Sequence, residues 1–360
     1  MGESTAAKQE HVLLTLLFPE PKDAIRRLRE KYPQVEFTYK QVTPKDDGSE
    51  LDKLYTKATI ICTIAALPDP TQAKDIKFIH FISAGVDHIS RKPIYTDSNV
   101  TLTTSSGIHG PMISEWVIMQ ILANSHKQKQ LLDWQRKHVW GTHAALGQLK
   151  DAVGMRLGVL GYGSIGRQTA RICKAMGMDV IAYTASPRET PESRHDHGYI
   201  VPGVGDEDGS IPSAWYSGLD QESLHNFLSQ DIDILLISVP LTEKTRHFLG
   251  AKEFELLGRK NALVVNISRG SIVVQEELIK ACKKDLKEGG LRGAALDVTD
   301  PEPLGPDSEL WDVDNIAVTP HTSSLSVAYV DRALQILEIN LGHLEAGEDL
   351  INVVDRKRGY

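Results

Sequence analysis

Three segments in the second half of the chain each carry a side chain suited to acid–base or anion chemistry. Arg269 follows the apolar run ALVVNI, Glu302 lies in the turn TDPEPL, and His321 follows the run NIAVTP. A histidine exchanges protons near neutral pH, and a neighbouring carboxylate favours its imidazolium form and orients its ring. An arginine binds a carboxylate through paired hydrogen bonds and can polarise a carbonyl oxygen. Such a set could hold a 2-keto acid and protonate its keto oxygen.

The three residues stand just beyond expected β-strands. Open α/β sheets bind ligands at the carboxyl ends of their parallel strands, so this position favours a shared site. Singly, Arg269 could be a surface ion-pair partner, His321 a structural histidine and Glu302 a solvated loop acid. Their joint occurrence in the order of motifs given below favours the catalytic interpretation.

Apolar runs of four to eight residues alternate with longer amphipathic stretches, which predicts an α/β protein. Most runs are rich in Val, Ile and Leu, as is typical of parallel strands covered by helices on both faces. The runs are HVLLTLLF, ATIICTI, KFIHFIS, RLGVLG, DVIAYT, DILLISV, ALVVNIS, RGAALDV and NIAVTP.

Two sheets are expected, one before about residue 105 and one from Arg156 to about Pro320. Between them, a helical stretch that Pro111 opens should form a connecting helix and then an arm. The amphipathic helix after Pro320 is expected to return to the first domain. The predicted domains are therefore 1–112 with 322–360, and 113–321.

The segment LGVLGYGSIGRQTARICKAMG contains G-x-G-x-x-G at Gly161, Gly163 and Gly166, after a strand and at the start of a helix. That context is the one that dinucleotide binding requires. The first glycine permits a tight turn, the second lets the backbone approach a pyrophosphate, and the third allows close helix–strand packing. The amides near Ser164 and Ile165 would meet the phosphates at the helix N-terminus. The alternative is a structural glycine-rich turn.

The acidic residue that usually grips the adenine ribose, about 20 residues further on, is missing. The strand DVIAYT ends on Thr184, which removes the repulsion that an acid would exert on a 2′-phosphate. Ser186 can donate a hydrogen bond and Arg188 can supply positive charge. These residues favour NADP over NAD, although Arg188 could also be an ordinary surface charge.

Composition narrows the class of protein. The 360 residues carry a net charge of −8, which argues against a nucleic-acid surface. The N-terminal apolar run is too short to cross a membrane and lacks a signal peptide's basic start. Cys62, Cys173 and Cys282 are too far apart in sequence to form a metal clip, and their sparse count fits a reducing compartment. We therefore expect a cytoplasmic protein without a metal, nucleic-acid partner or membrane anchor.

In their order, several fragments make the sequence similar to the D-isomer-specific 2-hydroxyacid dehydrogenase family. They are SAGVDHI, the glycine fingerprint, SVPLTEKTRHFL, NISRG, LDVTDPEP and TPH. The resemblance covers nearly the whole chain. It implies two doubly wound parallel-sheet domains, namely a discontinuous flavodoxin-like substrate domain and a Rossmann dinucleotide domain, with a cleft between them and a homodimeric assembly.

The resemblance also implies roles for further residues. Asp297 would hold the nicotinamide amide, or else cap a strand, and Val239 and Pro240 would flank the adenine or belong to the core. The loop SAGVD would bind the substrate carboxylate through backbone amides, or would be a plain tight turn. The substrate-binding residues implied are Ala84, Gly85, Val86, Arg269, His321 and Ser324. Both Ser324 and the turn YTASPR resemble the NADPH-dependent glyoxylate/hydroxypyruvate reductase branch.

The polar, aperiodic stretch 190–218 departs from the family, whose members usually have a much shorter connection here. A loop this long is either functional or mobile. His195 and His197 within it could bind a metal, but ordinary loop polarity is the favoured interpretation.

The sequence thus predicts an NADP-dependent 2-ketoacid reductase, which in reverse is a D-2-hydroxyacid dehydrogenase. The alternatives are the same chemistry with NAD, or a dinucleotide-sensing, corepressor-like interaction protein that shares the fold. Glyoxylate, hydroxypyruvate, branched and aromatic keto acids all carry the head group that the three residues would bind, so the substrate side chain stays open.

Overall fold

The computed structural model describes residues 9–43 and 49–359, and the chain divides into two compact units. Unit 1 extends to Ile108 and takes up the chain again from Val327, while unit 2 is the continuous segment His109–Ser326. The joins expected from the sequence, at 112/113 and 321/322, lie within five residues of these positions.

Unit 1 is built on a five-stranded sheet in the order β2-β1-β3-β4-β5, in which every pair of neighbouring strands is parallel. This is the flavodoxin-like strand order. The strands are β1 (His11–Leu16), β2 (Glu36–Gln41), β3 (Ile60–Thr63), β4 (Phe78–Phe81) and β5 (Thr101–Thr104). The helices are α1 (Lys22–Lys31), α2 (Ser49–Tyr55), η1 (Asp87–Ile89), α3 (Pro93–Thr96) and α12 (Tyr329–Ala346). The three central strands β1, β3 and β4 are buried along their whole length.

Helix α12 follows unit 2 in the sequence but belongs to unit 1, and it contacts the other elements of unit 1 along its length. The Tyr329 hydroxyl donates to the carbonyl of Ile82 over 2.8 Å, at the end of β4. The carbonyl of Ala333 lies 3.2 Å from Nε2 of the buried His80. Further along, Lys31 of α1 pairs with Glu338. The two ends of the chain therefore complete one unit.

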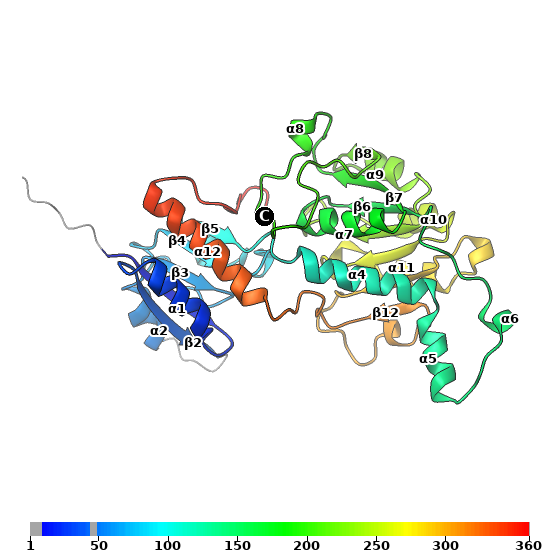
Figure 1. Ribbon diagram of the computed structural model, residues 1–360, viewed down its shortest axis with the longest axis horizontal. Coiled ribbons are helices and arrows are strands. Elements are labelled where there is room, and N and C mark those ends of the chain that lie inside the picture. The colour runs from blue at the N-terminus through cyan, green and yellow to red at the C-terminus, as the bar shows by residue number, and fades with distance from the viewer. Residues whose placement is uncertain (1–8, 44–48, 360) are drawn as a thin grey trace, which may run out of the picture. The chain divides into compact units, whose positions relative to one another are not determined.

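Unit 2 contains a seven-stranded parallel sheet in the order β12-β11-β10-β9-β6-β7-β8 (Figure 1). Numbered from β6, this is the Rossmann order 3-2-1-4-5-6 with one more strand beyond the sixth. The strands are β6 (Arg156–Leu160), β7 (Asp179–Thr184), β8 (Ala214–Ser217), β9 (Ile234–Ile237), β10 (Leu263–Asn266), β11 (Gly293–Leu296) and β12 (Ile316–Val318). The order reverses between β6 and β9, and that switch point is where such sheets bind ligands.

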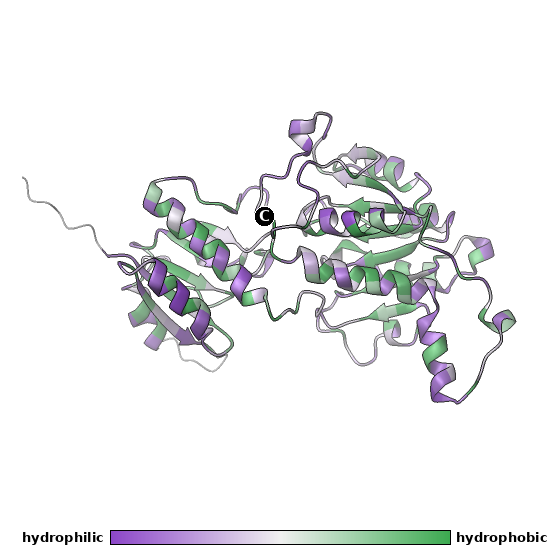
Figure 2. Ribbon diagram, viewed as in Figure 1, coloured by the Kyte–Doolittle hydropathy of each residue, from purple (hydrophilic) through white to green (hydrophobic). Residues whose placement is uncertain are grey.

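Helices cover both faces of this sheet, and each face has its own apolar cluster. On one face α4 (Gly110–Ser125) and α7 (Ser164–Ala175) pack on Val159, Leu236 and other strand residues. On the other face lie α9 (Gln221–Leu228), α10 (Ala251–Gly258) and α11 (Gln275–Lys283). Figure 2 shows the apolar strands beneath helices with polar outer sides. The double cover explains the almost uninterrupted apolar runs of the central strands.

The stretch that follows Pro111 forms two main helices. Helix α4 ends at Ser125, Lys127 takes up a left-handed conformation with φ of 51°, and α5 (Gln128–Arg136) follows. The short α6 (His143–Leu146) comes next. The arm formed by α5 and residues 137–153 exposes several apolar side chains, among them Leu131, Leu132, Val139 and the fully exposed Trp140.

Three other features considered in the sequence have these counterparts in the structure. The stretch 190–218 contains a one-turn helix, α8 (Pro191–Arg194), and the edge strand β8. The three cysteines are buried and unpaired, and burial raises the pKa of each thiol to about 12. Within the described residues, no helix combines the length and apolarity needed to cross a bilayer.

Candidate active site

The residues singled out for chemistry follow three neighbouring strands of unit 2. In the sheet β10, β11 and β12 lie side by side and parallel, with Asn266 opposite Leu296 and Leu296 opposite Val318. Arg269 comes three residues after the end of β10, and His321 three residues after the end of β12. The carboxyl edge of this sheet therefore collects them, as the sequence predicts.

Two of the three predicted catalytic residues, Glu302 and His321, are in direct contact. Nδ1 of His321 lies 2.6 Å from Oε1 of Glu302, and the side chains are 42% and 37% exposed. With Nδ1 held by the carboxylate, Nε2 is the ring nitrogen that can serve an external partner. His321 also has a φ of 52°, an uncommon conformation for a residue with a side chain. Such conformations persist where the surrounding structure imposes them, as at active sites.

The loop that carries His321 is held by the buried carboxylate of Asp297. Oδ1 accepts hydrogen bonds from the Thr319 hydroxyl at 2.6 Å and the Thr322 amide at 2.8 Å. Oδ2 accepts from both the amide and the hydroxyl of Ser323, and the Asp297 carbonyl accepts from the amide of His321 at 2.9 Å. Four bonds match the number of lone pairs on the two carboxyl oxygens. Asp297 thus positions the histidine loop, and its predicted contact with the nicotinamide amide stays a prediction.

Arg269 lies in a loop that touches the loop of Glu302. A side chain at Gly270 would meet the backbone of Thr299 at 2.0 Å, so only glycine permits this approach. The Arg269 guanidinium donates to the carbonyl of Ser268 at 2.8 Å, and the Arg269 carbonyl accepts from the side chain of Asn266 at 3.0 Å. Arg269 is partly exposed at the same sheet edge as His321.

A cavity of about 310 Å³ adjoins the histidine and is lined by residues of unit 2. Asp297, Glu302 and His321 form its polar wall. Leu304, Trp311 and Val318 are among its apolar lining residues. A space with a few convergent polar groups and an apolar remainder is typical of a small-molecule site.

The glycine turn at the switch point has the shape that a dinucleotide needs. At Gly161, with φ of 103°, a Cβ would lie 2.7 Å from the backbone of Ser238, and at Gly166 it would lie 2.5 Å from the carbonyl of Gly161. At Gly163 it would meet nothing within 4 Å, so the backbone faces open space there. Helix α7 starts at Ser164 without a side-chain cap, which leaves its first amides available to an anion. These residues, including Ile165 in the first turn, fit a pyrophosphate.

Around this turn lie the residues expected on the adenosine side. The hydroxyl of Thr184 donates to the carbonyl of Ser186 over 2.8 Å, while Ser186 itself is exposed. The half-buried Arg188 donates from Nη1 to the carbonyl of Ser193. Val239 and Pro240 follow β9 beside Gly161, with Val239 packed partly into the core. Their contacts with a cofactor stay predictions.

The predicted substrate residues outside this cluster have clear places in the chain. Ala84, Gly85 and Val86 follow β4 at the carboxyl edge of the unit 1 sheet, where the Ser83 hydroxyl donates to the carbonyl of Gly85. Ala84 is exposed and Val86 is buried. Ser324 lies three residues beyond His321 and is half-buried.

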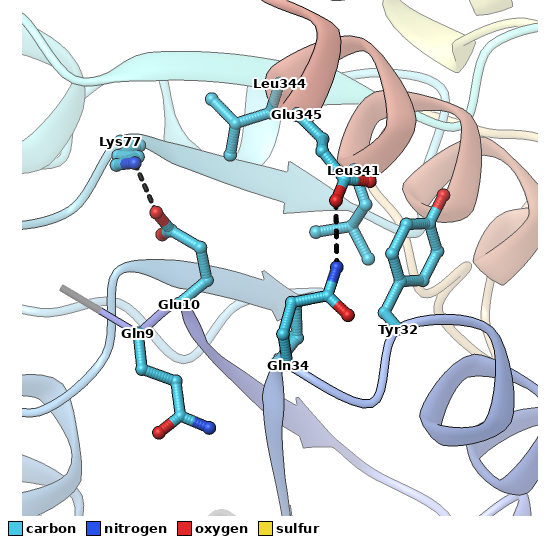
Figure 3. Close-up of a pocket in the computed structure, with 9 residues that line it drawn as sticks. Gln9, Glu10, Tyr32, Gln34, Lys77, Leu341, Leu344 and Glu345 are labelled. Carbon is cyan, nitrogen blue, oxygen red and sulfur yellow. Dashed lines mark hydrogen bonds and ion pairs between the residues drawn. The ribbon is translucent and has the colours of Figure 1, made fainter. Parts of the chain in front are cut away.

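A larger cavity, of about 470 Å³, lies in unit 1 (Figure 3). It is lined by Tyr32, Leu341 and Leu344 and by two polar pairs, Lys77 with Glu10 and Gln34 with Glu345. Because these polar groups satisfy one another, the cavity shows none of the convergent chemistry of the His321 region. No group of three or more His, Cys, Asp or Glu side chains in the described segments is arranged to hold a metal ion.

Comparisons with known proteins agree with this geometry. Residues 118–202 and 209–323, more than half of the chain, match the model of the D-isomer specific 2-hydroxyacid dehydrogenase NAD binding domain. The chain belongs to this family. Unit 2 is thus the NAD binding domain of a D-isomer specific 2-hydroxyacid dehydrogenase, and the predicted family and fold class are confirmed.

Three individual proteins resemble the chain over nearly its full length. A glyoxylate reductase of Aeropyrum pernix is 29% identical, with 97% of each chain covered. The NADPH-dependent glyoxylate/hydroxypyruvate reductase of Sinorhizobium meliloti, solved with NADP and sulfate, is 27% identical with a TM-score of 0.75 over 98% of this chain and 100% of that one. A family member from Xanthobacter autotrophicus, solved with NADPH, is 26% identical with a TM-score of 0.74 over the same shares.

Sequence reasoning missed a second group of polar residues in unit 2. Tyr162, Arg167 and Asp206 are at most 7% exposed and contact one another beneath the glycine turn. The only sequence signal was their surroundings, because two of them lie within the fingerprint segment and the third lies in the stretch 190–218.

Proposed function

We propose that the protein reduces a 2-keto acid to a D-2-hydroxy acid, reversibly, with NADPH as the preferred cofactor. The observation that carries the proposal is the bond between His321 and Glu302. Arg269, Glu302 and His321 follow β10, β11 and β12, which lie in that order in the sheet. A proton donor with its orienting carboxylate, near a guanidinium, is what reduction of a keto acid requires.

The side chains divide the work by their chemistry. When bound, the reduced nicotinamide supplies a hydride to the keto carbon. His321 donates a proton from Nε2 to the keto oxygen, which becomes the hydroxyl, and takes that proton back in the reverse reaction. Glu302 lies on Nδ1 and orients the ring, which leaves Nε2 to face the substrate. Arg269 binds the substrate carboxylate and polarises the keto oxygen.

The preference for NADPH is supported by the turn after β7. Thr184 replaces the acid that would repel a 2′-phosphate, and Ser186 is exposed for a hydrogen bond. The Arg188 guanidinium has five N–H donors. One of its nitrogens, Nη1, donates to the carbonyl of Ser193, and other N–H groups can donate to a phosphate. Two similar solved proteins hold NADP or NADPH. NAD is the alternative cofactor.

We propose further that the amides of Ala84, Gly85 and Val86 bind the substrate carboxylate, with Ser324 as an additional contact. This assigns unit 1 as the substrate domain. Both segments lie at carboxyl ends of parallel strands, the position where open sheets bind ligands.

A homodimer is the proposed assembly, with the arm of α5 and residues 137–153 in its interface. Exposed Trp140, Val139, Leu131 and Leu132 form an apolar surface that a second copy would cover. Light scattering coupled to gel filtration should give twice the 39.8 kDa chain mass. Changing Leu132 and Trp140 to Ser should shift that mass towards the monomer.

The decisive assay is a panel of 2-keto acids, from glyoxylate and hydroxypyruvate to branched and aromatic acids, with NADPH and NADH at equal concentrations. The proposal expects turnover with at least one acid, faster with NADPH, and a D product by chiral chromatography. Arg188→Ala should raise the KM for NADPH much more than the KM for NADH. Faster turnover with NADH would overturn the cofactor assignment, and no turnover with intact cofactor binding would overturn the enzyme.

A further inference from the structure

The segment 194–211, here called the insertion, is folded against the dinucleotide fingerprint. Residues 203–208 within it lie outside the match to the family model. Its contacts reach two separate parts of the cofactor region, the glycine turn before α7 and the turn 185–189 after β7. All of these residues belong to unit 2.

At the glycine turn the insertion contacts Tyr162, the residue between Gly161 and Gly163. Its hydroxyl donates to Oδ2 of Asp206 at 2.7 Å, and both residues are buried. Burial, with the hydrogen bond to Asp206, raises the pKa of Tyr162 far above its ordinary value, so the hydroxyl stays a donor. Asp206 also accepts from the amides of Ser210 and Ile211, which closes the insertion into a compact loop.

Arg167, the residue after Gly166, provides the second attachment and is 4% exposed. Its guanidinium donates to the carbonyl of Asp206 at 2.5 Å and to the carbonyl of Arg194 at 2.6 Å. Its Nε lies 3.3 Å from Oδ2 of Asp196, and its charge lies over the Tyr162 ring, 5.1 Å from the centroid. One buried cation thus joins the start of the insertion and Asp206 to the first turn of α7.

Arg194 extends the connection to the turn after β7. Its Nε donates to the carbonyl of Arg188 at 2.9 Å, and its Nη2 donates to the carbonyl of Glu189 at 3.3 Å. The Arg188 side chain donates in return to the carbonyl of Ser193, next to Arg194. The Arg194 guanidinium lies over the ring of Trp215, 5.8 Å from the centroid. The backbone of the proposed phosphate-binding turn is therefore held by the insertion.

We propose that Arg194 is a positioning residue for recognition of the NADP 2′-phosphate, acting through the backbone of Arg188 and Glu189. This deepens the proposed NADPH preference and rests on it. Arg194 would act by fixing the turn 185–189 before the cofactor binds. If the turn were mobile, the Arg188 guanidinium would lose conformational freedom on binding the phosphate, which would weaken the affinity. The Arg194 guanidinium contacts the ring of Trp215 and two backbone carbonyls, so in this proposal it does not bind the phosphate directly.

Isothermal titration with adenosine 2′,5′-bisphosphate and with 5′-AMP tests this in the full-length protein. The wild type should bind the bisphosphate at least tenfold more tightly. Arg194→Ala should weaken bisphosphate binding about tenfold and 5′-AMP binding less than threefold. Arg171→Ala is the matched control, since Arg171 reaches the insertion only through a 3.4 Å contact with the carbonyl of Gly205. It should change neither affinity more than twofold.

Arg194→Lys separates positioning from charge. Lysine keeps the positive charge but cannot donate to both carbonyls from one planar group. We expect Arg194→Lys to lose as much bisphosphate affinity as Arg194→Ala. Wild-type bisphosphate affinity in Arg194→Lys would overturn the positioning role. Equal losses for both nucleotides would overturn it as well, by showing a general structural effect. A wild type that binds the two nucleotides equally would refute the NADPH preference, and with it this inference.

Discussion

Two polar clusters of unit 2, that of His321 with Glu302 and that of Arg167 with Asp206, differ in burial. His321 and Glu302 have side chains that are 42% and 37% exposed. Arg167 and Asp206 are 4% and 7% exposed. A group that exchanges protons with a substrate must be reachable, whereas a group that holds a loop is most effective where water does not compete. The comparison predicts losses of rate from the first cluster and losses of stability from the second.

The largest effect is expected from His321→Gln. Without the proton donor, kcat for keto-acid reduction should fall by roughly 10²–10⁴ with little change in unfolding. His225→Gln is the matched control, because His225 forms a similar pair with Glu253 on the helices α9 and α10. Steady-state kinetics should show that this control keeps kcat within about threefold. Similar losses from both variants would contradict a specific role for His321.

Next in size is Asp206→Ala. It leaves the buried Tyr162 hydroxyl and two amides without their acceptor, so the free energy of unfolding should fall by about 3 kcal/mol. Asp208→Ala, in the same insertion but with its side chain 85% exposed, should cost less than about 0.5 kcal/mol. Urea denaturation measures both. Comparable losses would show that burial does not distinguish these acids.

A buried histidine in unit 1 sharpens the comparison with His321. Burial lowers the pKa of His80 to about 4, so it stays neutral in the folded state while an unfolded histidine titrates near 6.5. The unfolded chain then binds more protons between these values. Stability is therefore full above about pH 6.5 and falls by about 2–3 kcal/mol as the pH drops towards 4. His80→Asn should flatten this slope in denaturation series, whereas His138→Asn, at an exposed site, should not.

The smallest effect is expected from Glu302→Gln. The amide oxygen can still accept the hydrogen bond from Nδ1, but the negative charge beside the ring is lost, and a charge-assisted hydrogen bond becomes a weaker neutral one. We expect kcat for reduction to fall about tenfold, equivalent to about 1.4 kcal/mol, with the KM for NADPH unchanged. An increase in that KM alone would place Glu302 in cofactor binding instead.

The apolar runs predicted nine of the twelve strands found in residues 9–43 and 49–359, and the three missed ones share a physical reason. β2, β5 and β8 all lie at sheet edges. Central strands are covered on both faces and need continuous apolar runs, but an edge strand such as EFTYKQ is only half-buried and tolerates polar residues. Strand β8 has even less sequence signal, since it lies within the aperiodic stretch 190–218.

In the candidate site, too, some features were predictable from the sequence and others were not. Motif spacing predicts that Arg269, Glu302 and His321 follow strands that meet at one edge, because strand order brings them there. The attachment of Asp206 to Tyr162 spans 44 residues and depends on how an irregular loop folds. No periodic pattern encodes such a contact. The same holds for the four bonds of Asp297, which reach a loop more than twenty residues away.

Because unit 1 is assembled from both ends of the chain, the order of synthesis and the order of completion differ. Unit 2 is continuous from His109 to Ser326, so the ribosome delivers all of its strands before α12 is made. The sheet of unit 1 is made earlier but must wait for α12, whose Tyr329 contacts Ile82, just after β4, and whose Glu338 contacts α1. During translation unit 1 is therefore begun before unit 2 but completed after it.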